Sequence, residues 1–384
     1  MKKLKIIAVT ALFSLTSAHA SAAIKVGFML PYSGAYGTIG QTIENAFKLY
    51  VEEHGGKLAG QDIEYFRVDD ESNPSKGPEN ANRLIKRDQV DVLVGTVHSG
   101  VAMALTKAAK DAGITLIIPN AGADAITGPL CSKSVFRTSF SNWQPGYAMG
   151  PVASEKGYKT AVTVTWNYAA GKESTDGFKE AFEEKGGKVV KHLTVPFPTV
   201  EFQPLLTEIA SIKPDVVYAF FAGSGAVKFV QDYAAAGLAP NIPLVGSGFL
   251  TDGTLEAQGA SADGILTTLH YADNLNTQRD NAFRANFSKR YPSMPVDVYA
   301  MQGYDAAQLL NAGLQAVGGD IKQRDRMHEA MSNTVIDSPR GSFKLSPAGN
   351  PIQDIYLRQV KNGKNESVKV AVEKLADPAR GCNL

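Results

Sequence analysis

The sequence predicts an α/β protein with two domains, and three observations lead to that prediction. Its 384 residues are too many for one ordinary hydrophobic core and fit two domains of roughly 150–200 residues each. Hydrophobic residues make up 44% and charged residues 20%, which is a globular composition. Short apolar runs alternate with segments of helical spacing in two successive series, as in parallel sheets covered by helices.

The first strand and helix show the two patterns on which the prediction depends. Residues 24–30 form a short apolar run that ends at Pro31, which is typical of a buried strand. Residues 40–54 have helical spacing of apolar side chains and stop at Gly55. By the same patterns we expect strands at 63–68, 90–94 and 115–118, and helices at 78–88 and 99–113.

The alternation begins again in the middle of the chain. Residues 141–146 are the predicted linker. Beyond them we expect strands at 160–165, 189–193, 216–221 and 243–245, and helices at 174–185, 202–211 and 226–236. The repeated series of βα units indicates a second domain with the same architecture.

The last third of the chain departs from this alternation. Residues 281–291 and 301–317 are two long predicted helices with no strand between them, and late strands are expected at 341–343 and 355–360. Helices without intervening strands indicate that the chain returns to cover an existing sheet. We therefore expect two discontinuous domains that the chain crosses several times.

The amino terminus has the features of a secretory signal peptide. A basic start is followed by the mostly apolar run 6–17, and Ala18-His19-Ala20 has the small-x-small form of a cleavage site. The apolar run is too short for a transmembrane anchor, which needs roughly 20 residues. We expect residues 1–20 to be removed near Ala20, with a second possible cut after Ala23, and the mature protein to be exported and soluble.

Two cysteines, Cys131 and Cys382, belong to the exported part. An oxidising compartment favours a disulfide between them, which would stabilise the fold by about 2–4 kcal/mol. Two unpaired thiols are the alternative. We expect the bond, because a cysteine so near the end of the chain has little other use.

Charge and motifs exclude several classes of function. The 39 Lys and Arg against 38 Asp and Glu leave a net charge of +1, which gives no reason to expect nucleic acid or an anionic membrane as partner. The sequence has no phosphate-binding glycine loop, no G-x-S-x-G and no H-x-x-x-H pair. We therefore expect no enzymatic activity, no cofactor and no metal.

The segment 95–100 is the first candidate for a binding site. It joins a predicted strand to a predicted helix at the carboxyl end of the sheet, where open α/β sheets bind ligands. A hydroxyl at Ser99 and the free N–H groups of the helix start would favour a carboxylate. The alternative is that Ser99 only caps the helix. The next corner, 118–124, is small and polar, so its backbone could approach a ligand closely.

Short motifs occur in a characteristic order along nearly the whole mature chain. They are Pro31-Tyr32-Ser33-Gly34, Asp69-Asp70, Val94-Gly95 with Ser99, Pro119-Asn120-Ala121, Phe136-Arg137-Thr138, Tyr168 with Gly171, Gly237-Leu238 and Tyr304-Asp305-Ala306-Ala307. In order and spacing they resemble the periplasmic solute-binding proteins of the leucine/isoleucine/valine type, which serve ABC importers.

The resemblance implies the type I fold of that family. Two Rossmann-like lobes with parallel sheets would be joined by three hinge strands and close on a ligand between them. Residues 24–142 and 273–346 would form the first lobe, and residues 143–272 and 347–384 the second. It also implies a periplasmic location, a membrane permease as partner and, we expect, a monomer.

The resemblance also assigns the two ends of an amino acid ligand. Its carboxylate would meet Ser99, Asn120 and Ala121. Its ammonium would need a Thr and an acidic side chain, but those positions fall on Gly122 and near Gly248. A buried ammonium without a carboxylate partner is costly, so this departure argues against an α-amino acid. If the alignment slips at Gly248, Asp252 could supply the acid.

Aromatic residues crowd the same region and point to a ring-shaped ligand. This pattern of aromatic residues resembles the branch of the family that binds aromatic carboxylates such as benzoate or hydroxybenzoate. The predicted ligand-binding residues are Tyr36, His98, Ser99, Gly100, Asn120, Ala121, Gly122, Tyr168, Phe221, Ser247, Gly248 and Phe249. We interpret Arg137 as structural, and Asp69 and Asp70 as hydrogen-bond acceptors in a loop.

We thus expect a periplasmic component that delivers a small aromatic carboxylate to an importer and does no chemistry. One alternative keeps the fold but binds a branched-chain amino acid, which would require an acidic side chain near Gly248. Another is a ligand-sensing module of a receptor, which would require a fused or neighbouring membrane segment. An enzyme would need a nucleophile and a base within hydrogen-bond reach.

Overall fold

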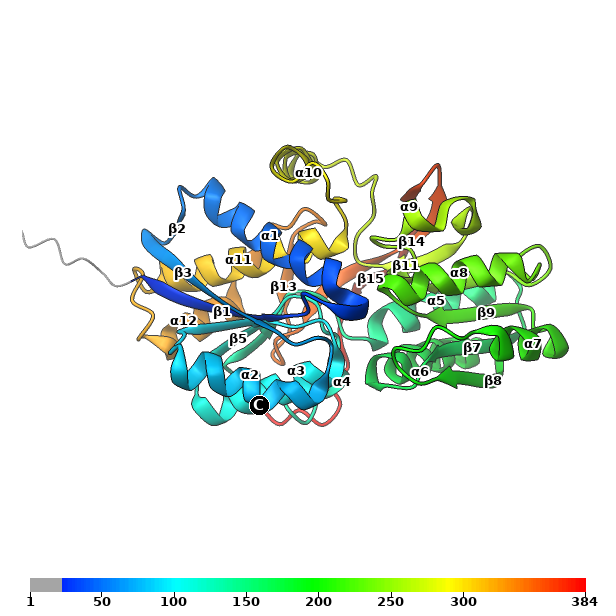
Figure 1. Ribbon diagram of the computed structural model, residues 1–384, viewed down its shortest axis with the longest axis horizontal. Helices are drawn as coiled ribbons and strands as arrows, with labels where there is room; N and C mark the ends of the chain where they lie inside the picture. Colours follow the sequence, from blue (N-terminus) through cyan, green and yellow to red (C-terminus); the bar gives the residue numbers. More distant parts are fainter. Residues whose placement is uncertain (1–22) are drawn as a thin grey trace, which may run out of the picture.

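Two β-sheets covered by helices organise the computed structural model, which describes residues 23–384 (Figure 1). We name the part built on the first sheet lobe 1 and the part built on the second sheet lobe 2. The two lobes lie side by side along the long axis of the molecule. This is the two-lobed α/β architecture that the sequence predicts. The expected signal peptide and its cleavage site lie outside the described residues.

The sheet of lobe 1 has the strand order β2-β3-β1-β4-β5-β6. Its pairs are parallel except for the short hairpin of β2 with β3. The strands are β1 (Ile24–Leu30), β2 (Lys57–Leu58), β3 (Gln61–Asp69), β4 (Val92–Gly95), β5 (Thr115–Ile118) and β6 (Val135–Arg137). The central strand β1 is almost wholly buried, as a continuous apolar run requires when helices cover both faces of a parallel sheet.

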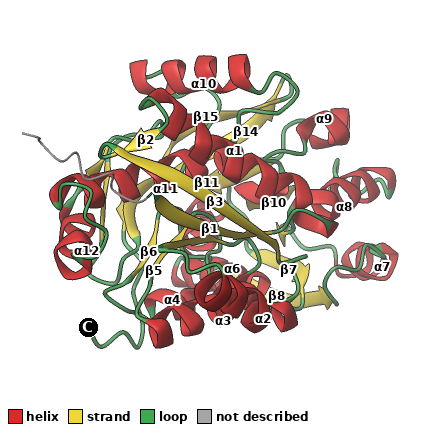
Figure 2. Cartoon of the chain, turned by 60° about the vertical axis from the view of Figure 1, so that its left-hand side comes forward, coloured by secondary structure: helices red, strands yellow, loops and turns green. Residues whose placement is uncertain are grey.

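Helices lie on both faces of this first sheet. Figure 2 shows α2, α3 and α4 on one side of β1, with α1 and α10 on the other. The helices of lobe 1 are α1 (Gly37–Glu53), α2 (Gly77–Asn82) with a π-helical turn (Arg83–Arg87), α3 (Ser99–Ala112), α4 (Asp124–Thr127), α10 (Gln278–Arg290), α11 (Val298–Ala316) and α12 (Arg324–Asn333). The predicted return of the chain is confirmed, because α11 packs along α1. Gly303 permits that contact, since a Cβ there would lie 2.1 Å from the carbonyl oxygen of Ile43.

The sheet of lobe 2 has the order β12-β13-β14-β11-β10-β9-β7-β8, and β15 pairs with β14. The βα series supplies parallel strands, and β14 joins them antiparallel to β11. The strands are β7 (Thr160–Trp166), β8 (Lys188–Val195), β9 (Val216–Phe220), β10 (Leu244–Ser247), β11 (Leu266–Leu269), β12 (Val335–Ile336), β13 (Phe343–Leu345), β14 (Pro351–Lys361) and β15 (Lys364–Leu375). The helices are α5 (Trp143–Glu155), α6 (Ala169–Glu184), α7 (Gln203–Ile212), α8 (Gly223–Ala235) and α9 (Leu255–Gln258).

The predicted linker at 141–146 lies where the chain crosses between the lobes but extends too far, because α5 begins at Trp143. Pro145 and Gly146 signal a break in the sequence, but both lie in the first turn of this buried helix. Gly146 serves close helix packing: a Cβ there would lie 2.0 Å from the carbonyl oxygen of Ser174 on α6. The helix α12 and the strand β15 were also not predicted.

The chain passes between the lobes after β6, after β11 and where β13 leads into β14, because β12 and β13, at the end of the second sheet, contact α11 and α12 of lobe 1. The predicted lobe boundaries remain a proposal. The end of the chain, grouped with lobe 2 in the prediction, lies against lobe 1 (Figure 1). There the predicted disulfide is confirmed between Cys131 and Cys382, with a Cα–Cα distance of 5.6 Å, and Thr127 Oγ1 donates to Asp377.

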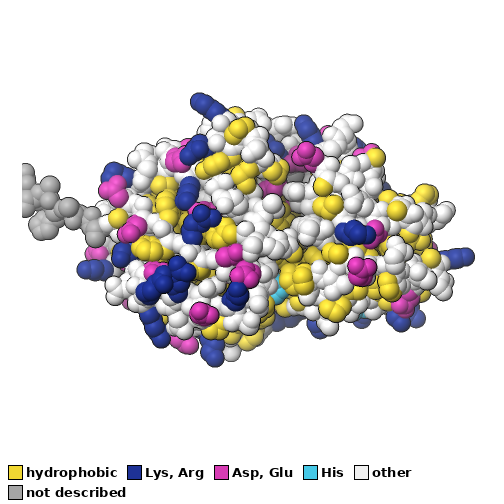
Figure 3. All heavy atoms as spheres, viewed as in Figure 1, with side chains coloured by type: hydrophobic (Ala, Val, Ile, Leu, Met, Phe, Trp, Pro, Cys, Tyr) yellow, Lys and Arg dark blue, Asp and Glu magenta, His cyan; other side chains and the backbone are white. Residues whose placement is uncertain are grey.

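Charged side chains of both signs are interspersed over the face of the molecule shown in Figure 3, in keeping with the small net charge. Within residues 23–384, no helix combines the length and the apolar character needed to cross a bilayer.

Candidate ligand-binding site

Ser99 begins α3 at the carboxyl end of β4 and is 1% exposed. The alternative interpretation, that Ser99 only caps this helix, is wrong. The cap is His98, whose Nδ1 accepts a hydrogen bond of 3.1 Å from the N–H of Gly100. Burial lowers the pKa of His98 to about 4, so the ring is neutral at pH 7 and can accept that bond. The Ser99 hydroxyl is thereby left free of capping and accepts a hydrogen bond of 3.2 Å from Asn142 Nδ2.

The neighbouring corner after β5 is already engaged within the chain. The N–H of Ala121 donates to the carbonyl oxygen of Thr96 at 2.9 Å. The side chain of Asn120 donates to Gln302 Oε1 at 2.7 Å. Of the three residues predicted to meet a carboxylate, Ser99 therefore offers the freest polar group, and Asn120 and Ala121 shape the wall beside it.

Aromatic side chains from both lobes meet next to this corner. Tyr36, in a 3₁₀ turn that precedes α1 of lobe 1, has its hydroxyl 3.0 Å from the hydroxyl of Tyr168, which precedes α6 of lobe 2. The ring of His98 lies 5.1 Å from that of Tyr168, which connects the aromatic group to the start of α3. The contact between Tyr36 and Tyr168 thus joins the two lobes.

A second group of rings extends this wall. Phe249 lies in a 3₁₀ turn after β10, with its ring 4.6 Å from Phe140, 6.2 Å from Phe220 and 6.1 Å from Tyr299. The sequence prediction included Phe249 but missed Phe140, which lies between β6 and α5, and Tyr299, which lies in the first turn of α11. The hydroxyls of Tyr299 and Ser247 are buried and lack hydrogen-bond partners among the described residues. Such groups are available to a polar ligand.

The assignment of Phe221 to the site needs correction. Its ring packs 5.0 Å from Phe202 and 4.6 Å from Phe229, in the core of lobe 2. Successive residues of a strand point to opposite sides, and Phe220 is the one that lies between Tyr168 and Phe249, at 6.3 and 6.2 Å.

Gly122 and Gly248, the positions of the missing ammonium-binding groups, do not leave empty space in the candidate site. A Cβ at Gly122 would lie 2.5 Å from Asn142 Oδ1 and 2.6 Å from the ring of Phe140. A Cβ at Gly248 would lie 2.4 Å from the guanidinium of Arg358. These glycines are required because other side chains of the protein fill the volume beside them.

Arg358 places a positive charge beside Gly248, the position where an amino acid ligand would need an acidic side chain. Its guanidinium is fully buried and donates to the Gly248 carbonyl oxygen at 3.1 Å and to Asp252 Oδ2 at 2.6 Å. Asp252 is therefore already paired with an internal cation. Among residues 23–384, no cluster of three metal-ligating side chains is present.

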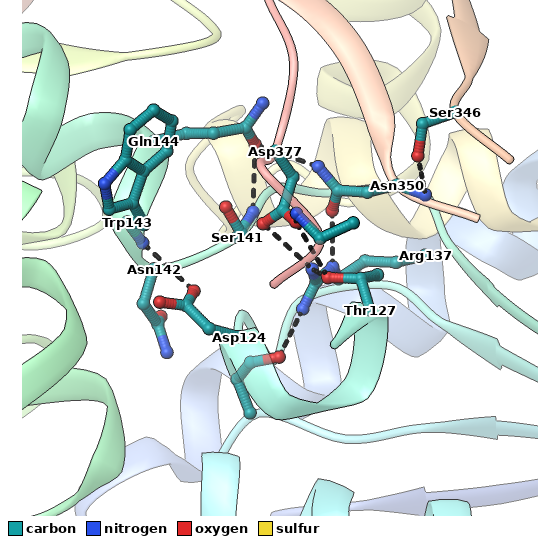
Figure 4. A network of polar contacts seen from close by, with 12 residues as sticks. Asp124, Thr127, Arg137, Ser141, Asn142, Trp143, Gln144, Ser346, Asn350 and Asp377 are labelled. Atoms are coloured by element: carbon teal, nitrogen blue, oxygen red, sulfur yellow. Dashed lines mark hydrogen bonds and ion pairs between the residues drawn. The ribbon is translucent and has the colours of Figure 1, made fainter. Parts of the chain in front are cut away.

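Three residues interpreted as structural are confirmed in that role. Figure 4 shows Arg137 beside Thr127 and Asn350, to which it donates at 2.8 and 2.6 Å, where the chain passes between the lobes. Asp69 accepts from the N–H of Tyr32, and Asp70 accepts from the N–H of Ser72.

Two residues of the site, Asn142 and Glu173, escaped the sequence analysis. Asn142 lies at the predicted linker, and Glu173 lies on the exposed-looking face of α6. Glu173 Oε2 accepts from Asn142 Nδ2 at 2.7 Å and from the N–H of Asp124 at 3.1 Å. Burial raises the pKa of Glu173, an effect opposed by these two hydrogen bonds and by Arg137. No local pattern could have found this contact, because its partners come from three separate segments.

Comparison with known proteins gives consistent results. The family model described as "Periplasmic binding protein" matches residues 23–365. A solute-binding protein of an ABC transporter from R. palustris, solved in complex with benzoate, is 53% identical, with a TM-score of 0.92 over 94% of this chain and 100% of that one. One from Rhodopseudomonas palustris BisB5, in complex with 3,4-dihydroxybenzoic acid, is 31% identical, with a TM-score of 0.87 over 93% and 99%. The Leu/Ile/Val-binding protein homolog 6 of Brucella melitensis is 30% identical over 98% of this chain and 99% of its own length.

Proposed function

The chain belongs to the periplasmic binding protein family, and from that premise we propose that it is the solute-binding component of an ABC importer for a small aromatic carboxylate. Benzoate and hydroxybenzoates are the ligands that fit this proposal. The protein binds its ligand in the periplasm, as a monomer, and hands it to a membrane permease without chemical change.

The observation that carries the proposal is the aromatic wall beside the start of α3. Tyr36, Tyr168 and Phe249 present ring faces and edges from both lobes, which suits a flat apolar body. The Ser99 hydroxyl at the start of α3 suits a carboxylate, because the start of a helix favours negative charge. The 53% identical protein from R. palustris carries benzoate, which supports the same ligand class here.

The cation at Gly248 argues against an α-amino acid. A ligand ammonium near this turn would lie close to the positively charged Arg358 guanidinium. The nearby carboxylate, Asp252, is already paired with Arg358 and is not free to bind the ammonium. Burying an ammonium beside a like charge costs about 2 kcal/mol or more unless a carboxylate of the protein pairs with it.

A branched-chain amino acid remains the second candidate, because the 30% identical Brucella melitensis relative is a Leu/Ile/Val-binding protein homolog. The two candidates differ in whether the ligand bears a cationic group.

Ligand capture proceeds by closure of the lobes about the segments that connect them. The hydroxyls of Tyr36 and Tyr168 lie 3.0 Å apart across the lobes, so they can form this contact only when the lobes are closed. The ligand stabilises this closed form, which the permease then recognises.

A thermal-shift screen tests the proposal directly. Ligand-stripped protein is heated with benzoate, 4-hydroxybenzoate, benzamide, leucine or isoleucine, because a ligand bound only by the folded state raises the melting temperature. We expect the two aromatic acids to raise it and the other compounds to leave it unchanged. Stabilisation by leucine or isoleucine alone would favour the second candidate.

A further inference from the structure

A hydrogen-bond chain connects Glu173 of lobe 2 to the Ser99 hydroxyl of lobe 1. Glu173 Oε2 accepts from Asn142 Nδ2 at 2.7 Å, and the same nitrogen donates to Ser99 Oγ at 3.2 Å. Glu173 belongs to α6, Ser99 to α3, and Asn142 to the segment in which the chain crosses between the lobes. The helices α6 and α3 also contact each other.

The direction of each hydrogen bond in this chain follows from the chemistry of its members. Glu173 Oε2 also accepts from the N–H of Asp124, so this oxygen acts as the acceptor in both of its hydrogen bonds. The Asn142 atom that faces it must therefore be the NH₂ group. The second hydrogen of that group points to Ser99 Oγ, which acts as acceptor. The hydroxyl proton of Ser99 is thus free to donate elsewhere.

The backbone around Asn142 holds its side chain in position to donate to both Glu173 and Ser99. It is 1% exposed, and its own N–H donates to the carbonyl oxygen of Gly122 at 2.7 Å. A side chain at Gly122 would displace it, since a Cβ there would lie 2.5 Å from Asn142 Oδ1. Figure 4 shows Asn142 next to Asp124, with Arg137 and Asp377 nearby. The charged groups that act on the Glu173 carboxylate are Asp124, Arg137 and Asp377.

We propose that Glu173 is a positioning residue for ligand binding: in the closed form it orients Asn142, which fixes the Ser99 hydroxyl with its proton free for the ligand carboxylate. This inference rests on the proposed function of the same site. Because Glu173 comes from lobe 2 and its partners Asp124 and Ser99 from lobe 1, opening of the lobes breaks the chain of contacts. Recognition of the carboxylate is thereby coupled to closure.

A double-mutant cycle with benzoate as probe tests this coupling. The affinities of the full-length mature protein and of Ser99→Ala, Glu173→Ala and the double variant are measured by calorimetry at pH 7.5. We expect each single change to weaken binding about tenfold, and the double variant to be no weaker than Ser99→Ala alone, because coupled residues are not additive. If the two losses multiply, Glu173 acts independently of Ser99 and the inference fails.

Two further variants keep the test sharp. Glu184→Ala is the matched control, since Glu184 lies at the end of the same helix and accepts a hydrogen bond from the Tyr147 hydroxyl of lobe 2. It should bind benzoate like the unaltered protein. Glu173→Gln keeps an oxygen that can accept from Asn142 and Asp124, so it should restore most of the affinity even if Glu173→Ala folds poorly. A Gln variant as weak as the Ala variant would contradict the inference.

The cycle also separates this inference from the proposed function. If the unaltered protein gives no heat with benzoate or 4-hydroxybenzoate, the proposed ligand class is wrong. If it binds benzoate but Glu173→Ala binds equally well, only the positioning role is wrong.

Discussion

At the scale of residues, the candidate site depends on which polar atoms already form hydrogen bonds within the protein. The N–H of Ala121 donates to Thr96, and the amide of Asn120 donates to Gln302. Because His98 caps α3, the Ser99 hydroxyl does not cap the helix. Because the cap residue lies one position before Ser99, the Ser99 hydroxyl stays available for the proposed ligand.

Replacing Ser99 with alanine should weaken benzoate binding by about 1–3 kcal/mol, because a carboxylate taken from water would lack one hydrogen bond. Calorimetric titration of both proteins measures the difference. Ser154→Ala is a suitable control, since that hydroxyl is buried without a partner among the described residues and lies in α5. Equal affinities for Ser99→Ala and the unaltered protein would remove Ser99 from the site.

The contact between Tyr36 and Tyr168 leads to a second prediction about single residues. Tyr168→Phe keeps the ring and removes the hydroxyl that lies 3.0 Å from that of Tyr36. Closure should lose about 0.5–1.5 kcal/mol, which appears as faster ligand release. Stopped-flow measurement of benzoate dissociation tests this. A release rate unchanged in Tyr168→Phe would show that the hydroxyl pair does not stabilise the closed form.

At the scale of elements, hydrophobic periodicity identified most strands and helices but not how they meet. The strand β5 coincides with its prediction at 115–118. The start of α5 was missed because Gly146, needed for contact with α6, is also typical of a turn. The sequence could not show whether Phe220 or Phe221 belongs to the candidate site, because it does not show which side of β9 faces the other lobe. Asn142 and Glu173 depend wholly on tertiary contacts.

The start of α11 carries a prediction of pH dependence. Asp297 caps this helix by accepting from the N–H groups of Tyr299 and Ala300, and burial raises its pKa to about 8. The unfolded value is about 3.9, so the folded state binds the proton more tightly between pH 4 and 8. This residue therefore lowers the free energy of unfolding as pH rises through that window.

Asp297→Asn tests this effect, because asparagine also caps helices but does not titrate. We expect the melting temperature of the unaltered protein to fall more from pH 5 to pH 8 than that of the variant. The difference between the two proteins isolates Asp297 from other titrating groups. Parallel pH profiles would show that Asp297 does not change its proton binding on folding.

At the scale of the whole molecule, the disulfide closes a loop of more than two-thirds of the described chain. Cys131 and Cys382 are 251 residues apart in sequence, and the bond holds the carboxyl-terminal tail against lobe 1. Changing both cysteines to serine should lower the free energy of unfolding by about 2–4 kcal/mol. Denaturant unfolding of the variant and the oxidised protein measures this. Identical midpoints would show that the tail contributes nothing to stability.

The two-lobed fold and the family could be predicted from the sequence because motif order extends over the whole chain. The closed arrangement could not, since it depends on pairs such as Tyr36 with Tyr168 that no sequence pattern connects. The same holds for Arg358, which is more than 100 residues from Gly248 and Asp252, at separations of 110 and 106 residues, yet fills the volume beside them.

The central claim is that the cleft takes an aromatic acid without an ammonium group. Calorimetric titration of ligand-stripped mature protein with benzoate, with 4-hydroxybenzoate and with leucine tests it most directly. We predict saturable one-site binding of at least one of the two aromatic acids and no heat of binding with leucine. Tight leucine binding without response to either aromatic acid would contradict the claim and establish the amino acid as the ligand class.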